Sequence, residues 1–312
     1  MRTVFFGSPP SALPSLRGLL EAGHEVGLVV TQPDKPAGRG RRLTPSAVKA
    51  FALERGLPVI EPDRIRKDAS VLPRIEEARP DVHIVVAYGQ IIPDPIIYFP
   101  RHRSLNVHFS LLPKYRGAAP VQWAVINGET ESGVTIIELN ERMDEGDILA
   151  RAGTAVGPRE TAGELEARLA VLGAGLLLET MGRLGSVVPE PQDHGRATLA
   201  PKVRKEDGLI DWSEDAVRVD RKVRALAERP GTFTFFHGRR LQVHRGRPLD
   251  GRWEGRRPGE ILRGGKDGLA VACGGGTGYL IETLRPEGKA EMTAYGFSLG
   301  TKFRPGDSLG NS

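Results

Sequence analysis

The sequence has almost no cysteine and no long apolar run. Its 312 residues include a single cysteine, Cys273, which excludes an intrachain disulfide framework and a metal site built from several thiolates. No apolar segment approaches the roughly 20 residues that a membrane-spanning helix needs. The N-terminal segment MRTVFFGSPP lacks the apolar core of a signal peptide and is interpreted as a first strand. These features predict a cytoplasmic protein that does not span a membrane.

The glycine-rich phosphate loops of nucleotide-binding proteins are also missing. No G-x-G-x-x-G motif follows the first strand, where FFGSPP offers one glycine and two prolines instead. No Walker A motif is present. The segment CGGGTG at 273–278 lies between two expected strands, without the helix that a phosphate cradle needs, and is interpreted as a turn.

Acidic residues are scarce in one region of the chain. From Ala216 to Arg257 there are twelve Lys or Arg and four Asp or Glu, so this region carries +8 in a chain whose formal net charge is +5. The remainder of the chain therefore sums to −3. This asymmetry favours an anionic partner, with nucleic acid first and a membrane surface second. A solvated, arginine-rich surface would give the same composition.

Alternating strands and helices are expected over residues 1–185. The expected strands are RTVFFG, EVGLVVT, LPVI, DVHIVVAYG, SLNVHF and SGVTIIEL, and ILARAGTAV is expected to add an antiparallel strand. Helices are expected at 10–22, 44–55, 118–127 and from Thr161 to about Leu184. The last of these would begin with a capping box of Thr161 and Glu164. The alternation predicts an α/β domain with a mainly parallel sheet.

The character of the chain changes after that helix. Residues 186–207 hold little apolar periodicity and are interpreted as a linker. One helix is expected at 213–227, where Val219, Val223 and Leu226 form an apolar stripe. Short strand candidates separated by glycine-rich turns follow it: TFTFFH, RLQVHR, GEILR, GLAVAC and YLIETLR. This pattern predicts a small barrel of the OB type at 208–312.

Two polar side chains interrupt the expected strand SLNVHF. Asn106 and His108 are two residues apart, so they project from the same face of the strand, while Val107 faces the other way. Both lie near the carboxyl end of an inner strand, where ligands of open α/β sheets bind. An amide donor and a histidine can hold a carbonyl oxygen as it becomes an oxyanion. Taken alone, the pair also fits an ordinary strand end.

The turn ERMDEGDIL places Asp144 and Asp147 between two apolar strands. A carboxylate close to a histidine stabilises the charged ring and orients it, and it can accept a proton through water. An ordinary Asp-Gly turn would read the same. Two carboxylates and a histidine also fit a metal site, but no second His or Cys stands at a suitable spacing, so no metal is expected.

A long loop, TQPDKPAGRGRRLTPSAVK at 31–49, follows the second expected strand. Its prolines and glycines make a regular element unexpected, and long structureless loops in compact domains are usually functional or disordered. The loop is basic and leaves the sheet on the same rim as Asn106 and His108. A basic loop beside a candidate site indicates that an anionic or macromolecular substrate arrives there, although a simple surface excursion is an equal reading.

Several collinear segments resemble the folate-dependent formyltransferases. They are VFFGSPPSALPSL, TQPDKPAGRGRRLTPSAVK, VVAYGQIIP, LNVHFSLLPKYRGAAPVQWAVINGE, SGVTIIELNERMDEGDIL, IDWS and LRPEGKAEM. The basic loop and the second domain resemble the branch that acts on tRNA. The resemblance implies a Rossmann-like catalytic domain, an OB-like tRNA-binding domain, and transfer of a formyl group from 10-formyltetrahydrofolate to methionyl-initiator tRNA, bound by its acceptor arm. It implies no metal and no obligatory protein partner, hence a monomer.

The resemblance also assigns residues to roles. It places the catalytic trio at Asn106, His108 and Asp144. Folate contacts are implied at Val86, Tyr88, Gly89, Gln90, Ser110, Leu111, Leu112, Pro113 and Asn140. The basic residues assigned to tRNA are Lys35, Arg39, Arg41, Arg42, Arg218, Arg221 and Lys222. Phe109 departs from the glycine common in relatives, and a narrower folate entrance is expected from it.

Two other functions remain open at this point. A formyltransferase acting on an amino-sugar nucleotide or on glycinamide ribonucleotide would share the catalytic block but would not need a separate basic module. A non-catalytic RNA-binding protein would keep the basic module but would not need all three catalytic positions filled.

Overall fold

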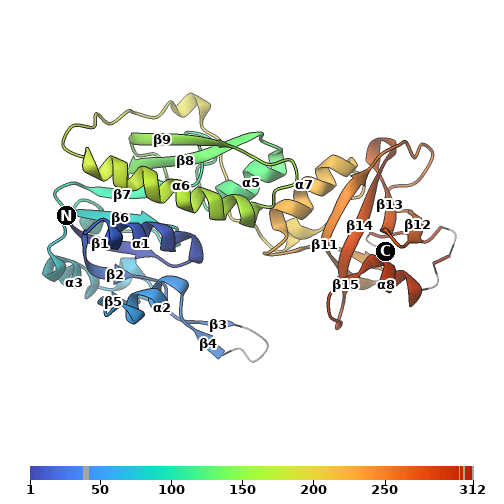
Figure 1. Ribbon diagram of the computed structural model, residues 1–312, viewed down its shortest axis with the longest axis horizontal. Coiled ribbons are helices and arrows are strands. Elements are labelled where there is room, and N and C mark those ends of the chain that lie inside the picture. Colours follow the sequence, from blue (N-terminus) through green and yellow to red (C-terminus); the bar gives the residue numbers. More distant parts are fainter. Residues whose placement is uncertain (38–41, 302, 305, 311–312) are drawn as a thin grey trace. The chain divides into compact units, whose positions relative to one another are not determined.

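The computed structural model describes residues 1–37, 42–301, 303–304 and 306–310, which form two compact units (Figure 1). The first unit comprises Met1–Pro120, Glu131–Ala155 and Glu166–Pro201, and the second comprises Val121–Thr130, Val156–Leu165 and Lys202–Ser312. Residues 186–201 therefore pack with the first unit. The domain boundaries expected from the sequence, with a linker at 186–207, stay a prediction.

A seven-stranded sheet forms the centre of the first unit, in the order β5-β2-β1-β6-β7-β8-β9. The strands are β1 (Arg2–Gly7), β2 (Glu25–Val30), β5 (Val59–Ile60), β6 (Val82–Val86), β7 (Ser104–His108), β8 (Glu131–Glu138) and β9 (Ile148–Ala155). Pairing from β5 to β7 is parallel, which confirms the mainly parallel sheet. Pairing of β7 with β8 and of β8 with β9 is antiparallel. Thr135 pairs with His108, so the chain re-enters the sheet near the end at which β7 leaves it.

Helices cover both faces of this sheet. They are α1 (Leu13–Glu21), α2 (Ala47–Glu54), α3 (Val71–Ala78), α4 (Asp94–Ile97) and α6 (Ala162–Gly182), with α5 (Pro120–Asn127) leading into β8. Figure 1 shows α1 and α6 together over one face. Ile75 of α3 packs with Val4 and Phe6 on the other face. No helix within the described ranges is both long and apolar enough to cross a membrane.

Helix α6 begins with the predicted capping box. The hydroxyl of Thr161 accepts a hydrogen bond from the Glu164 backbone N–H at 3.2 Å, and the Glu164 carboxylate accepts from the Thr161 N–H at 2.9 Å. Each side chain thereby satisfies a backbone donor that the first helical turn leaves without a partner.

The contact between α6 and the sheet depends on a glycine. A Cβ at Gly173 would lie 2.8 Å from Val107 Cγ1 and 3.2 Å from Val134 Cγ1, whereas a Cβ at Gly175 would meet nothing within 4 Å. We expect Gly173→Ala to lower the free energy of unfolding by about 1–3 kcal/mol through overpacking, less the gain of up to about 1 kcal/mol that alanine brings to a helix. Chemical denaturation measures this change.

The matched control is Gly175→Ala on the same helix. This variant gains helix propensity without the steric clash, so the denaturant concentration at the midpoint of its unfolding should stay the same or rise. Equal shifts in the two variants would contradict the close approach of α6 to β7.

The basic loop contains a regular element, so the expectation of irregular structure is wrong. β3 (Lys35–Ala37) and β4 (Arg42–Thr44) pair as a short antiparallel ribbon, with Lys35 opposite Thr44 and Pro36 opposite Leu43. Lys49 anchors its base through ion pairs to Asp34 at 2.8 Å and Glu61 at 2.7 Å. The prolines in this segment argued against a strand in the sequence. A short edge ribbon nevertheless tolerates proline, as Pro36 of β3 shows.

The second unit contains a six-stranded antiparallel sheet, which confirms the small β domain expected there. Its elements are α7 (Ala216–Leu226), β10 (Thr232–Phe236), β11 (Arg239–Leu249), β12 (Ile261–Gly265), β13 (Gly268–Cys273), β14 (Thr277–Pro286), β15 (Met292–Thr293) and α8 (Ala294–Leu299). Val219 and Val223 of α7 pack against Leu241 and Ile281 in its core. The indole of Trp212 donates to Thr234 Oγ1 at 3.0 Å. The short helix α8 was not expected.

Candidate active site

Asn106 and His108 project from one face of β7, as the two-residue period of a strand requires. Val85 of β6 is the register partner of Asn106, and it packs on the face covered by α3. Val107 points to the opposite face, toward α6. The pair thus lies on the sheet face away from α6, at the carboxyl end of β7, which is the predicted position.

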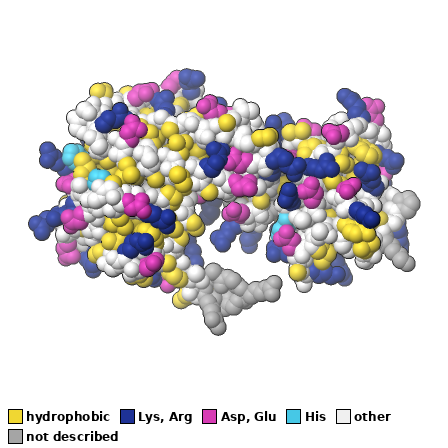
Figure 2. All heavy atoms as spheres, in the orientation of Figure 1, with side chains coloured by type: hydrophobic (Ala, Val, Ile, Leu, Met, Phe, Trp, Pro, Cys, Tyr) yellow, Lys and Arg dark blue, Asp and Glu magenta, His cyan; other side chains and the backbone are white. Residues whose placement is uncertain are grey.

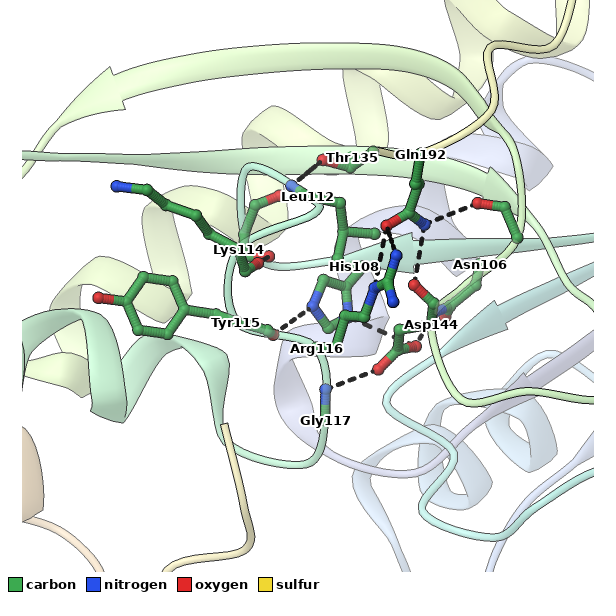
Figure 3. Close-up of polar contacts among 12 residues, drawn as sticks. Asn106, His108, Leu112, Lys114, Tyr115, Arg116, Gly117, Thr135, Asp144 and Gln192 are labelled. Atoms are coloured by element: carbon green, nitrogen blue, oxygen red, sulfur yellow. Dashed lines mark hydrogen bonds and ion pairs between the residues drawn. The ribbon is translucent and has the colours of Figure 1, made fainter. Parts of the chain in front are cut away.

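Asp144 completes the cluster from the turn between β8 and β9 (Figure 3). Its Oδ1 accepts from Asn106 Nδ2 at 3.3 Å and lies 3.7 Å from His108 Nδ1. Its Oδ2 accepts from the Gly117 backbone N–H at 2.9 Å. Asp144 has a φ of +56°, in the left-handed region that few residues other than glycine adopt. Three segments distant in sequence therefore meet at one carboxylate.

The ring of His108 is held from both sides. Its Nε2 lies 2.9 Å from the carbonyl oxygen of Tyr115, which accepts only, so Nε2 carries a proton. Its Nδ1 is the nitrogen that faces Asp144. At 3.7 Å the contact between Nδ1 and Asp144 Oδ1 is at ion-pair distance and is longer than a hydrogen bond. The side chain is 6% exposed, so these contacts are little screened by water.

A histidine and two carboxylates raised the possibility of a metal site in the sequence, although no metal was expected there. Within the ranges that the structure describes, no group of three or more His, Cys, Asp or Glu side chains is arranged to hold a metal ion. His108 and Asp144 instead belong to a hydrogen-bonded cluster with Asn106 and Gly117.

The loop after β7, assigned to folate contact, is held against β8. Thr135 Oγ1 donates to the Ser110 carbonyl at 2.7 Å and accepts from the Leu112 N–H at 3.1 Å. Ser110 and Leu112 are buried, whereas Leu111 and Pro113 are half-buried. Leu111 and Pro113 are therefore the more exposed apolar members of this segment, and its assignment to folate stays a prediction.

Phe109 lies behind this loop. It is 7% exposed, and its Cε1 would be 3.6 Å from a Cβ at Gly173 of α6. The ring packs in the core on the α6 side of the strand, away from Asn106 and His108. The structure therefore offers no support for a folate entrance narrowed by Phe109.

The other folate assignments lie after β6 and in the 140–144 turn. Gln90 binds the backbone of the neighbouring loop, accepting from the Ile65 N–H at 2.9 Å and donating to the Pro62 carbonyl at 3.0 Å. Tyr88 is buried edge-on against Phe6, and this burial raises the pKa of its hydroxyl well above the usual range. Val86 is buried, Gly89 is exposed with a φ of +80°, and Asn140 accepts from the Arg142 N–H at 3.0 Å. These roles stay predictions.

The basic loop is only partly described. Lys35 is exposed and its ammonium donates to Gln32 Oε1. Arg39 and Arg41 lie outside the described residues, as does the side chain of Arg42. The assignment of this loop to tRNA stays a prediction.

The three basic residues of α7 differ in exposure. Arg218 is exposed, 4.0 Å from Asp215. Lys222 is half-buried and donates to the Leu209 carbonyl at 3.2 Å. Arg221 is half-buried with its guanidinium against Gly128, where a Cβ would lie 2.0 Å from Arg221 Cζ. Arg218 is therefore the most exposed of the three, and the assignment of these residues to tRNA stays a prediction.

Part of the positive charge of the second unit is balanced locally. Figure 2 shows Lys and Arg side chains over this unit with Asp and Glu side chains among them. Arg245 and Arg247 share Glu282 at 3.0 and 3.5 Å, and Arg256 pairs with Glu260 at 2.9 Å. Several of the basic residues counted in the +8 therefore have an acidic partner, and fewer of them are free of an ion pair than that count suggests.

Sequence reasoning missed three groups that build the cluster. Gly117 supplies a backbone N–H and Tyr115 a carbonyl, and neither role depends on a side chain that a motif could reveal. Gln192 donates to the Asp144 carbonyl at 2.8 Å from a segment interpreted as a linker. No signal in the sequence marked Gln192, which stands in a polar, proline-containing run.

Two family models match the chain, one in its N-terminal part and one in its C-terminal part. Residues 1–181 match the model of the family described as Formyl transferase, and residues 202–302 match the model described as Formyl transferase, C-terminal domain. The chain belongs to the formyl transferase family. The family expected from the sequence is confirmed.

Curated relatives in this family match the whole chain. Methionyl-tRNA formyltransferase of Geobacter sulfurreducens is 43% identical over 100% of this chain and 98% of its own length. The protein of the same name from Citrifermentans bemidjiense is 44% identical over 99% and 96%, and that from Desulfotalea psychrophila is 45% identical over 97% and 93%.

Solved structures share the fold at low identity. HypX from Aquifex aeolicus, in complex with tetrahydrofolic acid, superimposes with a TM-score of 0.65 at 21% identity, over 95% of this chain and 46% of HypX. The sugar 3N-formyl transferase WlaRD, determined in the presence of dTDP and 5-N-formyl-THF, gives 0.66 at 16% identity, over 93% and 99%. The Rossmann-like architecture with a C-terminal β domain is thus shared with HypX and with the sugar 3N-formyl transferase WlaRD.

Proposed function

We propose that this protein transfers the formyl group of 10-formyltetrahydrofolate to the amino group of methionyl-initiator tRNA. The observation that carries the proposal is the convergence of Asn106, His108 and Asp144 in a chain that matches methionyl-tRNA formyltransferases from end to end. The acceptor arm is the part of the tRNA that reaches the site. The protein is proposed to act as a monomer, in the cytoplasm where aminoacyl-tRNA is made.

The reaction begins with attack of the neutral methionyl amine on the formyl carbon. Negative charge then develops on the formyl oxygen and needs donors that are already in place. An amide nitrogen carries two N–H groups, so Asn106 can bind Asp144 and the formyl oxygen together. His108 contributes the positive charge of its ring from the Nδ1 side, since Nε2 is bound to Tyr115. These two groups form the proposed oxyanion site.

The proton of the attacking amine must reach N10 of the folate as the old bond breaks. Asp144 is proposed to move it through one water, since the carboxylate sits beside the oxyanion site and keeps His108 charged. The new carbon–nitrogen bond forms on methionine, the bond from carbon to N10 breaks, and the amine proton ends on N10. His108 and Asp144 leave the cycle in the protonation states in which they entered.

The folate is proposed to contact three segments of the first unit. They are the 86–90 segment after β6, the loop from Ser110 to Pro113, and the turn from Asn140 to Asp144. The two loops that flank the catalytic trio are each hydrogen-bonded to β8. The Leu112 N–H donates to Thr135 Oγ1 at 3.1 Å, and the Glu138 N–H donates to the Asp147 carbonyl at 2.9 Å. A shape that is fixed before binding lowers the entropic cost of positioning the formyl group.

The basic loop is proposed to contact tRNA phosphates. Reversing charge with Arg41→Glu and Arg42→Glu should raise KM for methionyl-tRNA at least tenfold and leave KM for the folate donor unchanged. It should also flatten the dependence of tRNA affinity on salt, because each lost phosphate contact removes about 0.7–0.9 from the log–log slope. Steady-state kinetics at several salt concentrations measures both effects.

The control is Arg183→Glu, a charge reversal at the end of α6, where Arg183 pairs with Glu179 at 2.9 Å. It should leave KM for tRNA within about threefold, because a reversal at an exposed pair away from the substrate costs little. An equal rise in KM for both substrates in the loop variants would contradict the assigned role.

A competition between acceptors tests the proposal. The protein is mixed with isotope-labelled 10-formyltetrahydrofolate and charged initiator tRNA, charged elongator tRNA, an amino-sugar nucleotide or glycinamide ribonucleotide. Mass spectrometry of the released amino acid should show labelled formylmethionine from initiator tRNA, with less from elongator tRNA and no transfer to the two small acceptors. Transfer to either small acceptor at a comparable kcat/KM would contradict the proposal.

A further inference from the structure

Gln192 lies in a segment that the chemistry proposed above leaves without a role. The segment, residues 190–200, is pinned to the first unit at both ends. Glu190 and Ile148 exchange backbone hydrogen bonds at 2.8 Å, and Arg116 donates to Thr198 at 2.8 Å and accepts from Ala200 at 2.7 Å. Between these ends the segment contacts the turn that carries Asp144 through Gln192.

The side chain of Gln192 uses its full hydrogen-bonding capacity. Its Nε2 donates to the carbonyls of Asp144 at 2.8 Å and Gly146 at 2.7 Å. Its Oε1 accepts from Arg116 Nε at 3.1 Å and Nη2 at 2.8 Å. The reverse orientation of the amide would set donors against donors and an oxygen against two carbonyls, so this network fixes the orientation. Gln192 is 5% exposed, and Figure 3 shows it above Arg116 and Asp144.

The backbone of the turn that Gln192 binds is also constrained at Asp144 and Gly146. Asp144 is in the left-handed region, which few residues other than glycine adopt, although aspartate tolerates it better than most. A Cβ at Gly146 would lie 1.6 Å from the Glu138 carbonyl, so the backbone there is pressed against β8. The backbone carbonyls of Asp144 and Gly146, on either side of Glu145, both accept a hydrogen bond from Gln192. These two bonds restrain the backbone of the turn.

Arg116 links the same glutamine to the opposite wall of the cluster. It is 6% exposed, and its Nη1 lies 3.5 Å from Glu145 Oε1. Arg116 directly precedes Gly117, whose N–H donates to the Asp144 carboxylate. Gln192 therefore binds the backbone carbonyl of Asp144 and the side chain of Arg116.

We infer that Gln192 is a positioning residue that holds Asp144 in the geometry the reaction needs. This inference rests on the proposed function for its kinetic consequence, but its structural content stands on the network alone. Gln192→Glu keeps the length of the side chain and the acceptor for Arg116, but it sets an oxygen against two carbonyls. Gln192→Met keeps approximate size and removes both sets of bonds. Glu190→Gln is the matched control, because it removes only the exposed pair with Arg151.

Hydrogen exchange measured by mass spectrometry tests the inference without using activity. The peptide covering 139–148 should exchange faster in Gln192→Glu and Gln192→Met, while peptides from β1 and β6 keep the wild-type rate and show that the fold is intact. Glu190→Gln should exchange like the wild type. Wild-type exchange of the turn in both Gln192 variants would overturn the inference, whether or not the protein transfers formyl groups.

Kinetics then separates positioning from general support. We expect Gln192→Glu to lower kcat about 100-fold with KM for both substrates within about threefold, since a displacement of about 1 Å can cost that much. In a background of Asp144→Asn the same change should lower kcat less than threefold, because the group it positions is already lost. A full 100-fold loss in both backgrounds would show that Gln192 does not act through Asp144. If the wild type transferred no formyl group, but the turn still exchanged faster in the Gln192 variants, the proposed function would be wrong and the positioning role of Gln192 would remain supported.

Discussion

Replacing Asp144 with asparagine is expected to lower kcat by about 100-fold to 10,000-fold, the range typical of a lost general acid–base group. Asparagine can still accept from Gly117, so the turn should keep its place. What is lost is the charge that faces His108 at 3.7 Å and the oxygen that can take a proton. Single-turnover formylation with saturating enzyme measures the change, since it isolates the chemical step from product release.

Asp147→Asn is the matched control for this variant. Asp147 lies in the same turn, and its backbone carbonyl accepts from the Glu138 N–H at 2.9 Å, a bond that the substitution keeps. Its rate should stay within about threefold of the wild type. A loss of equal size in both variants, or a near-normal rate in Asp144→Asn, would show that the charge of Asp144 does not act in the reaction.

Removing the amide of Asn106 is expected to slow the chemical step by about 100-fold to 1,000-fold, or about 3–4 kcal/mol of transition-state stabilisation. The loss should fall on kcat, because a donor aimed at a developing oxyanion binds the transition state more tightly than the substrate. Folate affinity, measured by quenching of intrinsic fluorescence, should change little in Asn106→Ala.

Asn106→Asp separates the donor from the volume of the side chain. It has nearly the same shape, but it removes the N–H and places a second carboxylate 3.3 Å from Asp144 Oδ1. We expect it to be at least as slow as Asn106→Ala. A rate near that of the wild type in either variant would remove Asn106 from the oxyanion site.

The shared face of Asn106 and His108 could be predicted because a strand has a period of two. The approach of Asp144 could not be derived that way, because it depends on a left-handed residue and on the N–H of Gly117, 27 residues away. Only the resemblance to formyltransferases joined the three. Local patterns predict which way a side chain points, whereas a cluster built from loops depends on contacts that no local pattern encodes.

Other differences have similar causes. The resemblance led to the expectation of a folate entrance narrowed by Phe109, yet this side chain continues the alternation of β7 and packs toward α6. Gln192 sits in a run without apolar periodicity, so nothing in the sequence distinguishes it from its solvated neighbours. Its burial follows from hydrogen bonds at both ends of the segment, which only the folded chain brings together.

The most direct test of the reaction centre is a double-mutant cycle in single-turnover formylation of methionyl-initiator tRNA. Residues that act as one unit on one transition state are strongly non-additive. The account predicts that Asn106→Ala with Asp144→Asn is no more than about tenfold slower than the slower single variant, while the wild type forms formylmethionyl-tRNA readily. Losses that multiply in full, or a double variant that retains wild-type speed, would contradict a shared centre at Asn106, His108 and Asp144.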